Sequence, residues 1–270
     1  MKFPSLFTFL FLLSLNAFAQ IESSISRDNL IIGEQFKIIF DAANEERTIN
    51  VYLPHSYHPD STRTYPVIYL LDGSMDEDFL HIVGLVQFGS MPWINHLPES
   101  IVVGISNVDR VRDFTDSSAL ALDQEEFPTS GGSEKFIEFI ENTLFPAIGS
   151  NYQVSDQRTI IGQSLGGLLA TQILFEHPDL FDDYIIVSPS LWWNNESLLD
   201  QRLGSLEEKD IYIAVGDEGE AMRGYAEGLC EKIRPNHPES ERVHFDFFPQ
   251  CDHGDVLHLA VYNAFQVIEE

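Results

Sequence analysis

The stretch that decides the fold is Gly162-Gln163-Ser164-Leu165-Gly166-Gly167. It follows the apolar run 159–161 and opens the apolar-periodic stretch 165–176, an order that indicates a strand, a sharp turn and a helix. In this setting a G-x-S-x-G motif exposes its serine hydroxyl in front of the free N–H groups of a helix. A side chain at Gly162 or Gly166 would clash with the neighbouring backbone. The stretch therefore predicts a nucleophilic serine on a strained turn.

Apolar runs rich in β-branched residues extend on both sides of this stretch and indicate further strands. The expected strands cover residues 29–40, 47–53, 67–71, 101–106, 159–162, 184–188, 211–215 and 243–248. The first strand contains Gly33-Glu34, which is typical of a turn or a bulge. Expected helices cover residues 134–148, 165–176, 219–233 and 254–268.

Strand–helix alternation behind two leading antiparallel strands predicts an α/β fold with one eight-stranded, mostly parallel sheet and helices on both faces. In such sheets the active site lies beyond the carboxyl ends of the strands. The segments that directly follow each expected strand are therefore the places where chemistry is expected.

Composition limits the class of protein. The chain has 270 residues, of which 44% are hydrophobic, and a formal net charge of −28. Such a surface repels phosphate backbones and anionic lipids, so nucleic-acid and membrane-surface binding are excluded as functions. Nothing in the sequence indicates the oligomeric state.

The first nineteen residues are predicted to be a secretory signal peptide. Lys2 precedes an apolar run from Phe3 to Leu15, and Ala17-Phe18-Ala19 provides an A-x-A cleavage site. The run is too short and too polar to span a membrane. We expect cleavage after Ala19, one domain over residues 20–270, and a periplasmic or secreted protein without membrane insertion.

A serine nucleophile requires a base, and the order serine, acid, histidine predicts where to look. His253 alone among nine histidines lies directly between the last expected strand and the last expected helix. His258 is the alternative, but it falls inside that helix. The acid is expected after the strand 211–215, where Asp217, Glu218 and Glu220 are all candidates that spacing alone does not rank.

Two N–H groups are needed to hold an oxyanion. Leu165 follows the serine and supplies one, and Gly73 or Ser74, after the strand 67–71, supplies the other. No metal-binding or nucleotide-binding motif is present, so we expect no metal and no cofactor. Cys230 and Cys251 are expected to be too far apart for a disulfide, and therefore to be free thiols.

These residues together resemble the esterase D-type family of α/β-hydrolases, and in particular its siderophore (enterobactin) esterase branch. The resemblance covers nearly all of the chain after the signal peptide. It rests on four stretches: Tyr65–Gly73, Asp109–Asp113, Gly162–Ser164 and Ser188–Trp193, which reads Ser-Pro-Ser-Leu-Trp-Trp. The resemblance implies an α/β-hydrolase fold with Ser164 as nucleophile and His253 as base.

The resemblance also favours Glu218 as the acid, because the family has a methionine four residues after its acid and Met222 stands there. Because a catecholate siderophore is strongly anionic, we expect a local basic patch of Arg110, Arg112 and Arg223 to bind it, and we expect Trp192 and Trp193 to line an acyl or aromatic pocket. Ion pairing of the arginines and core packing of the tryptophans are the structural alternatives.

The expected function is an exported serine esterase that forms an acyl-enzyme from a small-molecule ester, of siderophore type or with an aryl group. Three alternatives share the fold: a carbohydrate-ester (feruloyl or acetyl) esterase, an acyltransferase and a non-catalytic binding protein.

Overall fold

The computed structural model of the chain describes residues 26–268. The chain divides between Ile32 and Gly33, and the sheet with its helices belongs to the unit Gly33–Glu270. Residues 26–32 have no regular secondary structure. The signal peptide predicted over residues 1–19 lies outside the described residues. In the described part of the chain, no helix has both the length and the apolar character needed to cross a membrane.

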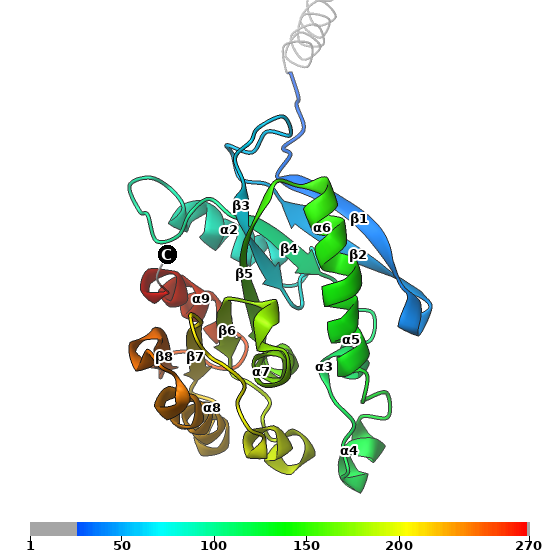
Figure 1. Cartoon of the computed structure of the whole chain (residues 1–270), viewed down its shortest axis with the longest axis vertical. Helices are drawn as coiled ribbons and strands as arrows, with labels where there is room; N and C mark the ends of the chain where they lie inside the picture. The colour runs from blue at the N-terminus through cyan, green and yellow to red at the C-terminus, as the bar shows by residue number, and fades with distance from the viewer. Residues whose placement is uncertain (1–25, 269–270) are drawn as a thin grey trace, which may run out of the picture. The chain divides into compact units, whose positions relative to one another are not determined.

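An eight-stranded sheet forms the centre of the unit (Figure 1). The strands are β1 (Gly33–Phe40), β2 (Glu45–Tyr52), β3 (Tyr65–Leu70), β4 (Ile101–Ile105), β5 (Val154–Gln163), β6 (Asp183–Val187), β7 (Asp210–Gly216) and β8 (Val243–Phe248). Their order is β1-β2-β4-β3-β5-β6-β7-β8. The pairs β1–β2 and β2–β4 are antiparallel, and the remaining pairs are parallel. The predicted eight-stranded, mostly parallel sheet is confirmed.

The first strand differs from the expectation at its start. The predicted strand begins at residue 29, whereas β1 begins at Gly33. The turn or bulge expected at Gly33-Glu34 is wrong, because Gly33 pairs with Tyr52 and Glu34 pairs with Val51 in regular antiparallel register. The Glu34 carboxylate also accepts a hydrogen bond of 3.0 Å from the Tyr152 hydroxyl.

Helices cover both faces of the sheet, as predicted. They are α2 (Phe79–Gly89), α3 (Arg110–Phe114), α4 (Ala121–Glu126), α5 (Ser133–Phe139), α6 (Phe145–Asn151), α7 (Leu165–Glu176), α8 (Glu220–Ile233) and α9 (Val256–Val267). The helices α2 and α9 pack in the core on one face, and α3, α5, α6, α7 and α8 contribute to the core on the other. Side chains of β3 alternate between the two cores: Val67 and Tyr69 enter one, and Ile68 and Leu70 the other.

The helix expected over residues 134–148 is interrupted. A π-helical segment, Ile140–Leu144, joins α5 to α6, and the Phe145 N–H donates to the Ile140 carbonyl five residues back. The reason is Pro146, in the first turn of α6. Its ring has no N–H to donate and would clash with the carbonyl four residues earlier, so the preceding turn widens.

Both cysteines are free and buried, as expected from their predicted separation. Cys230 lies within α8, and Cys251 lies in the loop between β8 and α9. The fold of the described residues therefore rests on packing and polar contacts without a covalent crosslink.

A buried ion cluster ties the antiparallel side of the sheet to α3. The Arg47 side chain on β2 is fully buried, and its guanidinium donates to Glu45 Oε1 and Asp113 Oδ2, both at 2.6 Å. The same group donates to the Ser106 carbonyl at 3.2 Å. Asp113 is fully buried too, and Arg112 Nε donates to it at 2.8 Å. Removing one member would leave an uncompensated charge in the interior.

We expect Arg47→Met to lower the free energy of unfolding by about 3–5 kcal/mol, because Asp113 would lose its buried partner. The matched control is Lys37→Met, which removes an exposed ion pair with Glu46 on the same two strands. That control should cost less than about 1 kcal/mol. Urea denaturation of the three proteins measures both effects, and equal losses would contradict the account of the buried cluster.

Candidate active site

Ser164 occupies a strained turn between β5 and α7. Its φ of 59° and ψ of −120° lie outside the regions that side-chain-bearing residues favour. Both backbone groups of Ser164 are held by the neighbouring β6 segment, since its N–H donates to the Val187 carbonyl and its carbonyl accepts from the Ser190 N–H, each at 3.0 Å. The turn is thus fixed by the adjoining strand and not by the motif alone.

The glycines before and after the serine have different roles. A Cβ atom at Gly162 would lie 2.4 Å from the Gly166 carbonyl oxygen, so the expected clash is confirmed there. At Gly166 the nearest heavy atom would be Asp72 Oδ2 at 3.3 Å, followed by Leu71 Cβ at 3.5 Å. The expected backbone clash at Gly166 is therefore wrong, because the space beside it is bounded by side chains.

His253 and Glu218 form a close pair. His253 Nδ1 lies 2.5 Å from Glu218 Oε2. The Glu218 side chain is almost completely buried, with 4% of its surface exposed, whereas the His253 side chain is 48% exposed. The other oxygen of Glu218 accepts from the Ser188 hydroxyl and, at 3.1 Å, from the Gly216 N–H. Three donors thus fix this carboxylate.

The contact between His253 and Glu218 changes the pKa of each side chain in the direction that favours its charged form. The hydrogen bond to Glu218 raises the pKa of His253, with burial opposing it. Burial acts to raise the pKa of Glu218, but hydrogen bonds from His253 and Ser188 outweigh it and the net pKa is lowered. Glu218 is therefore ionised at neutral pH and can only accept, so the proton between the two groups resides on His253 Nδ1.

The structure separates the three candidate acids. Glu218 is the one that contacts His253. The Asp217 side chain is exposed, and its N–H donates to the Cys251 carbonyl at 2.7 Å. Glu220 is exposed and is the first residue of α8.

Ser164 and His253 line the same cleft, which has a volume of about 660 Å³. Its other lining residues are Ser190, Trp192, Asp217, Glu218, Met222 and Asp252. We call this the histidine cleft. A second hollow of about 370 Å³ also reaches Ser164 and His253 and is lined in addition by Asp72, Glu77, Asp78, Arg110, Gln163 and Gly254. We call it the arginine cleft.

The two serines of the Ser188–Trp193 stretch were not predicted as site residues. Ser190 Oγ lies 3.3 Å from Ser164 Oγ, and Ser188 holds Glu218. The available signal was their position directly after β6, at the carboxyl edge of the sheet where the site was expected.

One of the expected oxyanion donors is already engaged. The Gly73 N–H donates to the Ile105 carbonyl at 3.0 Å, so its assignment to the oxyanion is wrong. Gly73 is packed against β4, where a Cβ atom would lie 2.4 Å from Gly104 Cα. Of the two alternatives Ser74 remains. Leu165 is the first residue of α7, where an N–H has no acceptor within its own helix.

Of the expected substrate-binding arginines, Arg110 and Arg112 are paired with carboxylates. Arg110 borders the arginine cleft, but its Nε and Nη2 bind Asp72 Oδ1 and Oδ2 at 2.6 and 2.8 Å. Arg112 joins the buried cluster through Glu45 and Asp113 and lines neither cleft. The substrate-binding role expected for Arg112 is therefore wrong, because the cluster occupies its guanidinium.

The two adjacent tryptophans also differ. Trp192 lines the histidine cleft. Trp193 is 2% exposed and packs its ring against Phe127, with the centroids 5.5 Å apart. The substrate-binding role expected for Trp193 is wrong, since successive side chains along this turn point in different directions and this one enters the core.

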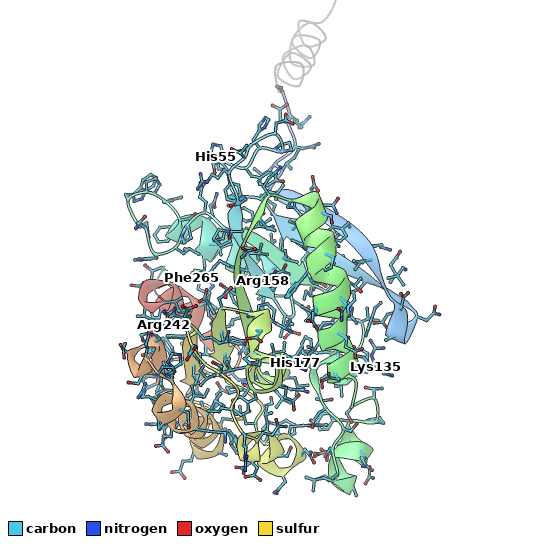
Figure 2. The ribbon with its side chains drawn as sticks, in the orientation of Figure 1. His55, Lys135, Arg158, His177, Arg242 and Phe265 are labelled. Carbon is cyan, nitrogen blue, oxygen red and sulfur yellow. The ribbon has the colours of Figure 1, made fainter. Side chains whose placement is uncertain are left out.

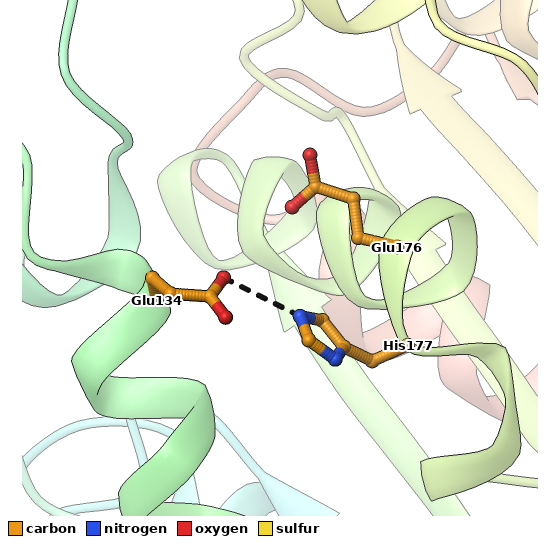
Figure 3. A group of neighbouring side chains, drawn as sticks. All are labelled: Glu134, Glu176 and His177. Carbon is orange, nitrogen blue, oxygen red and sulfur yellow. Dashed lines mark hydrogen bonds and ion pairs between the residues drawn. The ribbon is translucent and has the colours of Figure 1, made fainter.

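A group of side chains outside both clefts could hold a metal ion. Glu134 at the start of α5 and Glu176 and His177 at the end of α7 bring three ligand atoms within 4.8 Å of one another (Figure 3). His177 Nε2 lies 3.3 Å from Glu134 Oε2. This group was not predicted, because Glu134 and His177 lie 43 residues apart in the sequence, on two different helices.

The mostly parallel sheet with helices on both faces is an α/β-hydrolase fold, and the family of the chain gives its class of activity. A protein-family model described as "Putative esterase" matches residues 41–253, and the chain belongs to this family. Ferri-bacillibactin esterase BesA of Bacillus subtilis is 32% identical over 250 residues, which cover 84% of this chain and 86% of BesA.

Two solved structures are also similar. The BES protein from Bacillus cereus superimposes with a TM-score of 0.76 and 29% identity, over 91% of this chain and 100% of that one. An IroE-like serine hydrolase from Shewanella oneidensis superimposes with a TM-score of 0.77 and 26% identity, over 87% of this chain and 79% of that one. The resemblance to siderophore esterases inferred from the sequence motifs is confirmed, and this protein is an esterase.

We expect Gly162→Ala to destabilise the protein by about 1–3 kcal/mol, because the added methyl group forces the turn away from the Gly166 carbonyl. Gly166→Ala is the matched control, since its methyl group meets a side-chain oxygen at 3.3 Å, which a small shift relieves, and no backbone atom. Thermal unfolding and esterase activity measured on both variants test the difference. A control that loses as much stability as Gly162→Ala would contradict the assigned roles.

Proposed function

We propose that this protein is a serine esterase in which Ser164 is the nucleophile, His253 the general base and Glu218 the acid that orients the imidazole. The observation that carries the proposal is the 2.5 Å contact of His253 Nδ1 with a buried carboxylate, in a cleft that also contains Ser164. Since Nδ1 carries the proton, the lone pair of Nε2 is available to accept the serine proton.

The reaction follows from these positions. Ser164 Oγ attacks the ester carbonyl carbon while its proton passes to His253 Nε2. The negative charge on the carbonyl oxygen is held by the N–H groups of Leu165 and Ser74. Collapse of the intermediate breaks the ester C–O bond, and the alcohol leaves with the proton from His253. Water, deprotonated by the same nitrogen, then releases the acyl group as a carboxylic acid and regenerates Ser164.

For the substrate we propose a small-molecule ester of siderophore type or with an aryl group. The name of the Bacillus subtilis relative, a ferri-bacillibactin esterase, supports the first class. Trp192 in the wall of the histidine cleft supports either class, because its ring offers a flat surface to an aromatic or chelating group. We further propose that the enzyme acts outside the cytoplasm, as the residues that precede Gln20 suggest.

We expect Ser164→Ala to lower kcat/KM for a short-chain p-nitrophenyl ester by at least about 10³-fold, because no acyl-enzyme can form. The measurement is paired with labelling by a fluorophosphonate, which should modify the wild-type protein at Ser164 and leave the variant unmodified. Full activity in the variant would rule out Ser164 as the nucleophile.

The pH dependence tests the acid. His253 must be neutral to accept the serine proton, and Glu218 raises its pKa. We expect Glu218→Gln to move the acidic limb of the kcat/KM profile to lower pH, because the neutral amide no longer stabilises the imidazolium, and to lower the maximum rate. Glu220→Gln, at the start of α8, is the control and should keep the wild-type limb. An unmoved limb in Glu218→Gln would refute its role.

A further inference from the structure

The two clefts that meet at Ser164 are lined by an excess of carboxylates. Asp217 and Asp252 are exposed in the histidine cleft, beside the Glu218–His253 pair. Glu77 and Asp78 border the arginine cleft. Burial and the neighbouring Asp72 raise the pKa of Asp78 to about 6, which leaves this carboxyl mostly ionised at neutral pH.

Positive charge does not balance these groups. Among the described residues that line the two clefts, Arg110 is the one arginine, and no lysine is found. Its guanidinium holds both oxygens of Asp72 and also donates to the Gln163 carbonyl at 3.2 Å. The charge of Arg110 is therefore already matched by a bidentate carboxylate, and only its Nη1 group is left to offer a ligand anion a hydrogen bond.

Cations outside the two clefts do not supply the missing positive charge. Arg223, next to Met222 on α8, pairs with Glu227 at 2.7 Å and lies over the Phe247 ring. Lys135, Arg158 and Arg242, labelled in Figure 2, belong to α5, β5 and the turn before β8, and none of them lines either cleft. The local field at Ser164 therefore has the same sign as the net charge of −28.

An anionic ester would have to enter this field with no cationic side chain in the clefts other than Arg110, whose charge Asp72 already matches. A ferric complex of three catecholates is such an anion. An uncharged or cationic ester meets no such barrier, and Trp192 and Met222 offer it a polarizable apolar wall.

From these contacts we propose that the clefts select esters whose acyl and alcohol parts are uncharged or positively charged, and that Asp217 and Asp252 are specificity-determining residues. This proposal rests on the serine-esterase function proposed above. If the substrate is a metal-loaded siderophore, the proposal requires that the negative charge of its chelating groups does not exceed the positive charge of the bound metal.

The test compares three p-nitrophenyl esters of equal chain length: the hexanoate, the 6-(trimethylammonio)hexanoate and the adipate monoanion. All three share one leaving group, so kcat/KM reports the charge preference. At low ionic strength we expect the cationic ester to exceed the anionic one by at least about tenfold, with the neutral ester between them. Added KCl should narrow the ratio, because salt screens the field.

Two double variants then distinguish the effect of the carboxylates in the cleft from the effect of the net charge of the whole protein. Asp217→Asn combined with Asp252→Asn should lower the cation-to-anion ratio several-fold, and asparagine keeps the oxygen with which Asp252 accepts from the Gly254 N–H. The control, Glu138→Gln combined with Glu141→Gln, removes the same charge from exposed positions on α5 and the π-helical segment. It should leave the ratio unchanged. Each single variant of Asp217 and Asp252 should give part of the effect.

The outcomes distinguish the two proposals. Hydrolysis of the neutral ester together with equal or faster hydrolysis of the anionic ester overturns the charge selection and leaves the esterase mechanism standing. The charge selection is also overturned if the two double variants change the cation-to-anion ratio equally, because the preference would then come from the net charge of the protein and not from the clefts. If none of the three esters is hydrolysed, the serine-esterase function fails, and the charge selection fails with it.

Discussion

The turn at Ser164 is the constraint on which the rest of the structure depends. A residue with a side chain is held at positive φ, and the chain can pass there only because Gly162 leaves room for the Gly166 carbonyl. Contacts with the neighbouring strand and helix offset the free-energy cost of this backbone conformation. The polar backbone groups of Ser164 are bound by Val187, the last residue of β6, and by Ser190 beyond it, and α7 is buried from Leu165 to Phe175. A helix that is apolar all round can exist only at the centre of a packed domain, so the turn and the core stabilise each other.

Adjacency in the sheet explains how distant residues form one site. The strands β5, β6, β7 and β8 are neighbours and run parallel, so their carboxyl ends lie along one edge. Ser164 follows β5, Ser188 and Ser190 follow β6, Glu218 follows β7 and His253 follows β8. The order of the groups along the chain therefore repeats the order of their strands in space. This is why the same edge contains Ser164, His253 and the groups that hold the Glu218 carboxylate.

Much of this arrangement could be predicted from the sequence, because its strongest signals are local. The bounds of α7 and β8 match the expected 165–176 and 243–248, since an elbow and a short run rich in aromatic residues carry local signals. Signals that depend on distant partners were missed. Arg112 lies 67 residues from Glu45, and nothing in its own segment indicates that it belongs to a buried cluster. The oxyanion role predicted for Gly73 was wrong for the same reason, because the carbonyl that binds its N–H belongs to Ile105 on β4. The helices α3 and α4 are too short to show a period, whereas α2 was missed although its buried residues recur at three- and four-residue steps.

The two buried thiols have a practical meaning for the chemistry of the surroundings. Cys230 and Cys251 remain unpaired in a fold whose described residues contain no covalent crosslink. The folded state therefore owes nothing to the redox potential of its compartment. A reducing environment therefore removes no crosslink from this fold, and both thiols are buried away from soluble oxidants.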